Sequence, residues 1–142
     1  MKHNLNYALI LVLFVLAIAA CKKDVPREEL LTSGSWRGES SIATVLGLSI
    51  NLNDSLPACA KDDLTNFQTD KNVLIDEGPT KCDPSDPQTY SLGTWSLSEN
   101  DTKLSFGGTN YDIQELSDSR LKLSGPFGGL GITGTIEVTY VK

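Results

Sequence analysis

Three cysteines, Cys21, Cys59 and Cys82, are the residues of this chain best suited to covalent chemistry. The only histidine is His3 and the only methionine is Met1, and both lie in an N-terminal segment with the composition of a removable signal. Without that segment the chain has no imidazole, which excludes histidine-activated nucleophiles and histidine-containing zinc or copper sites. Catalysis by paired carboxylates remains open in principle. No such pair forms a recognisable motif, so we predict no enzymatic activity, no metal and no cofactor.

The first twenty-one residues have the pattern of a secretion signal that ends at a cysteine. Lys2 and His3 precede an apolar run from Ala8 to Ala20, which is too short to span a bilayer. The segment Leu16–Cys21 resembles the lipobox of bacterial lipoproteins. That resemblance implies removal of residues 1–20 and acylation of Cys21 with chains such as palmitate, which together would anchor the protein stably. The alternative is an ordinary cleaved signal followed by a chance cysteine.

Charge restricts the partners of the processed chain. The sequence has 12 basic and 18 acidic residues, and loss of Lys2 with the signal leaves 11 basic residues and a formal charge of −7. An acidic surface disfavours nucleic acid and anionic lipid, so we predict no nucleic acid partner. The lipoprotein resemblance implies the cell envelope, at the outer membrane, on either its periplasmic face or the cell surface. Membrane contact is then through the acyl chains on Cys21.

Cys59 and Cys82 form an even pair in an exported chain, which predicts a disulfide. Closing a loop of this length would stabilise the fold by roughly 3 kcal/mol in the chain-entropy model. A reactive thiol pair is the competing interpretation, but the spacing is far from that of a Cys-x-x-Cys redox motif.

The domain organisation follows from these assignments. Residues 1–20 are the signal, residues 21–29 are a lipidated flexible tether, and residues 30–142 are one domain with a single core. The tether is charged and carries Pro26, so it has too little apolar surface to pack as part of a folded core. A single helical turn could form over Arg27–Thr32.

Apolar and polar residues alternate along most of the domain, which is the periodicity of half-buried strands. The clearest run puts Leu46, Leu48, Ile50 and Leu52 on one face. The other expected strands cover 36–43, 64–69, 73–76, 95–97, 104–106, 111–113, 121–123 and 136–140. Turn residues between successive runs favour hairpins joined in sequence. We therefore predict an all-β fold, a small antiparallel up-and-down barrel of about eight strands with one disulfide.

Several segments of the domain resemble lipocalin-like lipoproteins common in Bacteroidota. The resemblance rests on Gly34-Ser35-Trp36, on Cys59–Asp63 followed by Phe67 and Cys82, and on Gly93–Leu97 and Lys103–Phe106. It extends from about Leu30 to the C-terminus. The chain departs from the lipocalin pattern in having no Thr-Asp-Tyr run and no arginine on its last strand to stack under Trp36. The resemblance implies a barrel that binds a small apolar or amphipathic ligand without catalysis.

Aromatic side chains on the expected apolar faces are the candidate ligand contacts. They are Trp36, Phe67, Trp95, Phe106, Tyr111 and Phe127. An eight-stranded barrel is either filled by its side chains or just wide enough for one small ligand, and both alternatives remain open. A filled barrel would favour a protein-interaction module, such as an inhibitor or an envelope-assembly accessory, whose loops contact another envelope protein.

Two further segments have alternative interpretations. The glycine-rich stretch Gly125–Gly131 is either a mobile lip over an apolar mouth or a long hairpin turn with Phe127 and Leu130 tucked beneath it. Acidic residues gather in the middle third of the chain: Asp62, Asp63, Asp70, Asp76, Glu77, Asp83 and Asp86. They could hold calcium, but they lack calcium-loop spacing, so solvated turn residues are the preferred interpretation.

Overall fold

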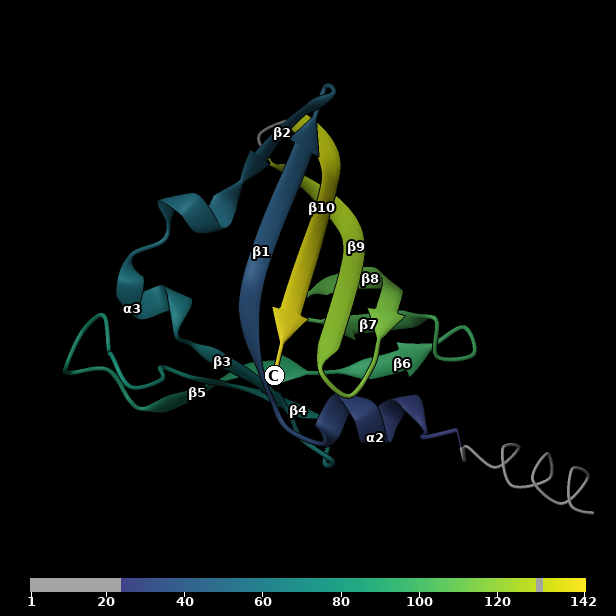
Figure 1. The fold of residues 1–142 in the computed structure, drawn as a ribbon, viewed down its shortest axis with the longest axis horizontal. Helices are drawn as coiled ribbons and strands as arrows, with labels where there is room; N and C mark the ends of the chain where they lie inside the picture. Colours follow the sequence, from purple (N-terminus) through teal and green to yellow (C-terminus); the bar gives the residue numbers. More distant parts are fainter. Residues whose placement is uncertain (1–23, 130–131) are drawn as a thin grey trace, which may run out of the picture.

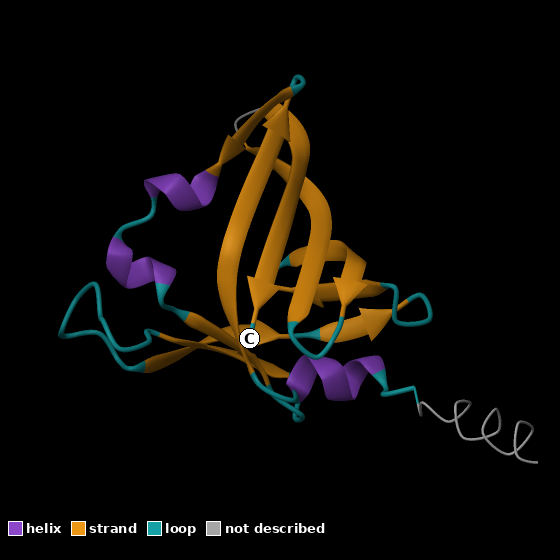
Figure 2. Cartoon of the chain, in the orientation of Figure 1, coloured by secondary structure: helices purple, strands orange, loops and turns teal. Residues whose placement is uncertain are grey.

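The computed structural model describes residues 24–129 and 132–142, and these form one antiparallel sheet with short helices beside it (Figure 2). The elements in chain order are α2 (Arg27–Thr32), β1 (Ser35–Val45), β2 (Leu48–Asn51), η1 (Leu52–Ser55), α3 (Ala58–Lys61), β3 (Leu64–Phe67), β4 (Asn72–Asp76), β5 (Thr89–Thr94), β6 (Ser96–Ser98), β7 (Lys103–Phe106), β8 (Thr109–Leu116), β9 (Arg120–Gly129) and β10 (Ile132–Val141). The predicted all-β class is confirmed, with ten strands in place of about eight.

The strand order is β5-β4-β3-β1-β10-β9-β8-β7-β6, and β2 pairs with β1 beside this path. No ladder closes the described sheet, so the expected barrel is open at this point. Its two outermost strands, β5 and β6, are nevertheless consecutive in the chain and are joined through Trp95. One continuous segment, Thr89–Ser98, thus pairs with β4 through its first half and with β7 through its second half. The two ends of the sheet are therefore parts of one bent segment, although no ladder joins them.

The core occupies the end of the sheet nearest α2, where β1, β3 and β4 cross behind the C-terminus of β10 (Figure 1). Alternation puts the apolar side chains of neighbouring strands on one face, as in the pairs Leu121–Tyr140 and Leu104–Tyr111. The buried core cluster consists of Leu31, Trp36, Phe67, Val73, Trp95, Leu104, Phe106, Leu121 and Leu123. All of these except Leu31 come from the predicted strands or from loops that join them.

Helix α2 packs against the domain, so residues 27–29, which were assigned to the tether, are helical. The helix begins at Arg27, directly after Pro26, and buries Leu31 in the core cluster. Its polar side contacts two distant loops, since Glu28 pairs with Lys71 at 2.6 Å and Arg27 donates to the Asp101 carbonyl at 3.0 Å. None of the helices in the described part of the chain is long and apolar enough to span a membrane.

The strongest alternation in the sequence, over Leu46–Leu52, does not face the core as expected. The chain turns at Leu46 and Gly47, and β2 pairs with the far half of β1, beyond the core cluster. Leu46 is 95% exposed, Leu48 79% and Ile50 60%. Period-2 alternation reports only that one face of a strand is apolar, and here no described element covers that face.

The structure of the glycine-rich stretch also differs from both predicted alternatives. β9 continues to Gly129 and pairs with β10 from Ile132 onward, so most of Gly125–Gly131 is strand. Backbone hydrogen bonds to β10 offset the low intrinsic stiffness of glycine, which is why residues 125–129 form a strand in place of a lip or a turn. Phe127 lies opposite Gly134 in this ladder. Leu130 and Gly131 lie outside the described residues.

The predicted disulfide is present. Cys59 in α3 is bonded to Cys82, which lies in the loop between β4 and β5, and their Cα atoms are 5.2 Å apart. The bond fixes this long loop against the short helix that precedes β3 (Figure 1, left). Cys21 lies outside the described residues.

Candidate functional site

Four of the six candidate ligand residues are packed against one another in the core. Trp36, Phe67, Trp95 and Phe106 are all buried. The ring of Phe67 meets Phe106 edge-on with 5.2 Å between centroids, and it meets Trp95 in the same way at 6.1 Å. Such edge-to-face pairs stabilise a filled interior. At this end of the sheet the side chains themselves occupy the space between the strands.

The indole N–H groups of both tryptophans are used within the protein. Trp36 Nε1 donates to the Leu31 carbonyl at 2.8 Å, and Trp95 Nε1 donates to the Gln68 carbonyl at 2.9 Å. A buried indole needs such a partner. Neither N–H group is therefore available to hold a ligand.

Of the two remaining candidates, Tyr111 packs against the core and Phe127 does not. Tyr111 extends the aromatic group, with its ring 5.1 Å from that of Phe106. A Cβ atom at Gly125 would lie 2.6 Å from the Tyr111 ring, so the absence of a side chain there lets the ring fit. Phe127 is half-buried in β9 and is not part of the core cluster. The structure therefore brings five of the six residues together.

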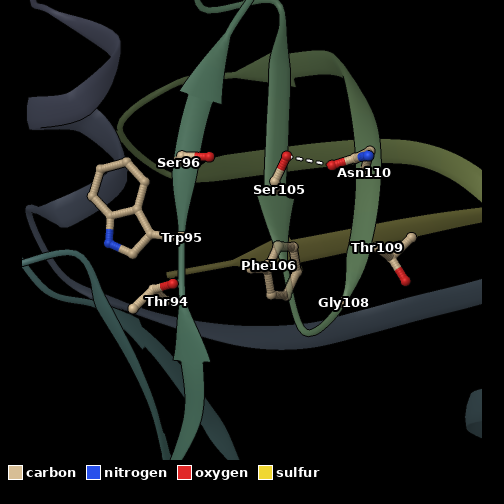
Figure 3. Close-up of a pocket in the computed structure, with 8 residues that line it drawn as sticks. All are labelled: Thr94, Trp95, Ser96, Ser105, Phe106, Gly108, Thr109 and Asn110. Carbon is tan, nitrogen blue, oxygen red and sulfur yellow. Dashed lines mark hydrogen bonds between the residues drawn. The ribbon is translucent and has the colours of Figure 1, made fainter.

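A depression of about 330 Å³ opens beside this aromatic group, where β6, β7 and β8 meet (Figure 3). It is lined by Thr94, Trp95, Ser96, Ser105, Phe106, Gly108, Thr109 and Asn110. Figure 3 shows Ser96, Ser105 and Asn110 in a row across the three strands, with Ser105 donating to the Asn110 side chain. The lining has no charged side chain. It combines hydroxyl and amide groups with the two aromatic residues, which is the chemistry that suits a neutral molecule with polar and apolar parts.

A second depression, of about 310 Å³, lies where the turn before β1 meets the end of β3. Its lining residues are Thr32, Ser33, Gly34, Ser35, Asn66, Phe67, Gln68 and Thr69. Ser35 already donates to the Asn66 side chain at 2.6 Å. Phe67 is the only aromatic residue in this lining, so this depression offers less apolar surface than the first.

The end of the chain supplies a cation over Trp36, which the sequence analysis missed. Lys142 Nζ lies 4.4 Å from the centroid of the Trp36 ring and donates to the Leu30 carbonyl at 3.0 Å and to Ser33 Oγ at 2.6 Å. Burial lowers the pKa of Lys142, and Asp118 partly opposes that shift. The ammonium group therefore ties the last residue to α2 and the first strand. A lysine thus takes the place that an arginine has in the lipocalin pattern.

The acidic residues of the middle third are mainly turn residues. Asp83 accepts from the backbone and the hydroxyl of Ser85, and Asp70 accepts from both the backbone and the side chain of Asn72. These hydrogen bonds lower the pKa of both carboxyl groups. Within residues 24–129 and 132–142, no three His, Cys, Asp or Glu side chains are grouped so as to hold a metal ion.

Asp63 is different, because its environment opposes its charge. Asp62 and Asp63 each have a buried carboxylate oxygen with no hydrogen-bond partner among the described atoms. Burial raises the pKa of Asp63, and repulsion from Glu77, Asp62 and Asp76 raises it further. The ionised form of Asp63 therefore opposes folding.

We expect Asp63→Asn to raise the free energy of unfolding at pH 7 by about 0.5 kcal/mol, because the neutral amide removes a charge that burial and the neighbouring carboxylates disfavour and that solvent partly screens. The folded-state pKa of Asp63 lies above its ordinary value of 3.8. The advantage of the variant is thus present at neutral pH and is lost as pH falls through the raised pKa. Urea unfolding at a series of pH values measures it. Asp83→Asn is the control and should be destabilising at pH 7, because the pKa of Asp83 is lowered; equal effects in the two variants would contradict the argument.

The sequence matches the lipocalin-like domain family over residues 32–123. Because that match covers most of the chain, this protein belongs to the lipocalin-like domain family, as the Trp36 and Trp95 segments suggested. The family has a small-ligand-binding β-barrel fold and typically consists of binding proteins without catalytic activity. Comparisons with curated proteins and with solved structures give no match.

Proposed function

We propose that this protein is a lipid-anchored lipoprotein of the bacterial cell envelope, at the outer membrane, that binds a small neutral amphipathic molecule without catalysis. The observation that carries the ligand proposal is the uncharged depression beside Trp95 and Phe106. Family membership supports a binding role. The lipobox-like residues before Cys21 support the anchor.

The residues that line the depression favour an amphipathic ligand over a purely apolar one. Its lining combines Trp95 and Phe106 with Ser96, Thr109 and Asn110. An aliphatic chain alone would leave these hydroxyl and amide groups without partners, which costs free energy. A ligand with hydroxyl or amide groups on one side and an apolar face on the other satisfies both surfaces.

Native mass spectrometry of the protein purified from its own envelope in mild detergent tests both parts of this proposal. We expect a polypeptide that begins at Cys21 with acyl chains attached, together with a repeatable additional small mass. Thr109→Trp should remove that mass, because an indole at this position fills the first depression. Thr69→Trp fills the second depression and is the matched control, which should retain the mass.

The two parts fail separately. A bare acylated mass from the wild-type protein would reject the ligand and leave the anchor. An unmodified Cys21, or a chain that still carries residues 1–20, would reject the anchor. Loss of the mass in Thr69→Trp but not in Thr109→Trp would move the site to the second depression.

A further inference from the structure

The end of the sheet farthest from α2 carries no charge. Residues 40–53 and 123–136 contain no Asp, Glu, Lys or Arg, although 21% of the whole chain is charged. These two stretches form the far halves of β1 and β9, all of β2 and the start of β10, which are hydrogen-bonded neighbours. Figure 1 shows them gathered at the top of the molecule. We call this region the uncharged end.

Strand β2 is the open edge of this region. Among the described residues it pairs only with β1, so the backbone groups on its other side have no strand partner. Natural edge strands are usually protected by a charged side chain, a proline or a bulge. β2 has the sequence Leu-Ser-Ile-Asn and contains none of these. The edge strand β6 is followed at once by Glu99, whereas the first charged residue after β2 is Asp54, three positions beyond the strand.

The turn that begins β2 is unfavourable for its own residues. Leu46 and Gly47 have φ of 52° and 79°, the pattern of a two-residue hairpin turn that normally uses Asn-Gly. Leu46 therefore adopts a left-handed conformation that an L-residue with a branched side chain rarely takes. It also exposes nearly its whole apolar surface. Both features are unfavourable for an isolated chain. A contact that covers the hairpin would offset the free-energy cost of exposing the Leu46 side chain.

We propose that β2 pairs antiparallel with β2 of a second copy of this chain, about a two-fold axis at Ser49. In that register Leu48 lies opposite Ile50 of the second copy, and Ile50 lies opposite its Leu48. Residues directly opposite each other in an antiparallel pair point to the same face of the sheet. Val45 and Ala43 already lie opposite Leu48 and Ile50 within each copy. The pairing therefore joins apolar rows across four strands.

Charge and geometry both favour a second copy over a membrane. The residues that pair between the copies are uncharged, and the nearest carboxylate in sequence, Asp54, is held at the end of β2 by the Asn51 side chain at 3.1 Å. Helix α2 lies at the opposite end of β1 from the turn at Leu46 (Figure 1), and eleven strand residues span about 35 Å. A short tether from Cys21 would thus hold the uncharged end away from the membrane that carries the anchor.

A four-residue ladder gives an interface smaller than the roughly 1,200 Å² typical of stable complexes. Dimerisation should therefore depend on concentration. Attachment of many copies to one membrane raises their effective concentration. This last point and the position of the uncharged end relative to the membrane rest on the proposed function; the pairing surface does not.

Disulfide crosslinking of the full chain in its own envelope tests the pairing. Ser49→Cys adds a thiol at the proposed axis, and Cys59 and Cys82 are already bonded to each other. Mild oxidation should give a dimer band on a non-reducing gel. Ser98→Cys is the matched control, an exposed serine on the opposite edge strand, and should remain monomeric. Adding Ile50→Lys to Ser49→Cys should reduce the dimer to the level of the control, because two lysines would then flank the axis.

Ile50 is largely exposed, so Ile50→Lys should keep its fold, and its melting temperature checks this. Leu48→Lys is the second variant if Ile50→Lys melts early. Absence of a Ser49→Cys dimer in protein shown by mass to be acylated would overturn the pairing and leave the anchor intact. Dimers that persist in both lysine variants would also overturn it. An adduct with another protein, or binding of the wild-type chain to phosphatidylcholine vesicles without a dimer, would reassign the uncharged end.

Discussion

Replacing Trp36 with alanine is expected to lower the free energy of unfolding by about 4 kcal/mol. The side chain has no exposed surface, its Nε1 donates to the Leu31 carbonyl, and Lys142 lies over its ring. Truncation therefore leaves a large cavity, a carbonyl without its donor and an ammonium group without its aromatic partner. Small domains have a total stability of about 5–15 kcal/mol, so the variant should be close to unfolding.

Urea unfolding followed by circular dichroism measures this loss. Trp36→Phe keeps an aromatic ring and removes only the indole donor and part of the volume, so its loss should be clearly smaller. Tyr90→Ala is a matched control, since Tyr90 is an exposed aromatic residue outside the core cluster. A Trp36→Ala variant as stable as Tyr90→Ala would show that the indole is not central to the core.

Removing the disulfide with Cys59→Ser and Cys82→Ser together is expected to cost about 3 kcal/mol. The bond spans 23 residues of sequence and encloses β3 and β4, which pair with β1 and β5. Without it, the unfolded chain gains conformational freedom, and the long loop that carries Cys82 is no longer tied to α3. The midpoint of urea unfolding should therefore fall.

The wild-type protein unfolded with a reductant present provides the control for this second prediction. It should unfold at the same urea concentration as the double variant, because both lack the crosslink. A double variant with the wild-type midpoint would mean that the folded domain does not depend on the bond. A variant less stable than the reduced wild-type protein would instead indicate that the serine hydroxyls fit the site poorly.

The architecture was largely readable from the sequence, because strand periodicity and turn residues are local properties. The predicted strands around Trp36, Leu104 and Leu121 are all present, and they bury the predicted residues. The disulfide was predictable because only two cysteines remain after Cys21 is assigned to the anchor. The lipocalin-like resemblance, carried by the same aromatic segments, agrees with the family match over residues 32–123.

The candidate site was predicted only in part. Five of the six aromatic candidates lie together, but whether they enclose a cavity depends on packing between strands distant in sequence. The rings of Trp95 and Phe67 are in edge-to-face contact and fill this part of the interior. The indole N–H groups of Trp36 and Trp95 donate to backbone carbonyls. The hydroxyl and amide row of Ser96, Ser105 and Asn110 becomes visible only when three strands are set in register.

The sequence alone determined the class of the fold, the crosslink and most of the segments that form strands, since these follow from periodicity, turn chemistry and cysteine count; β5 and the far half of β9 were not among them. The tertiary structure alone decided which apolar face is covered. Leu48 and Leu104 lie in equally regular alternations, yet Leu104 is buried and Leu48 is exposed. The difference lies in the neighbours: Leu104 pairs with Tyr111 over the core, whereas Leu48 pairs only with Val45 at the uncharged end. Burial is a property of the assembled sheet, and no single strand encodes it.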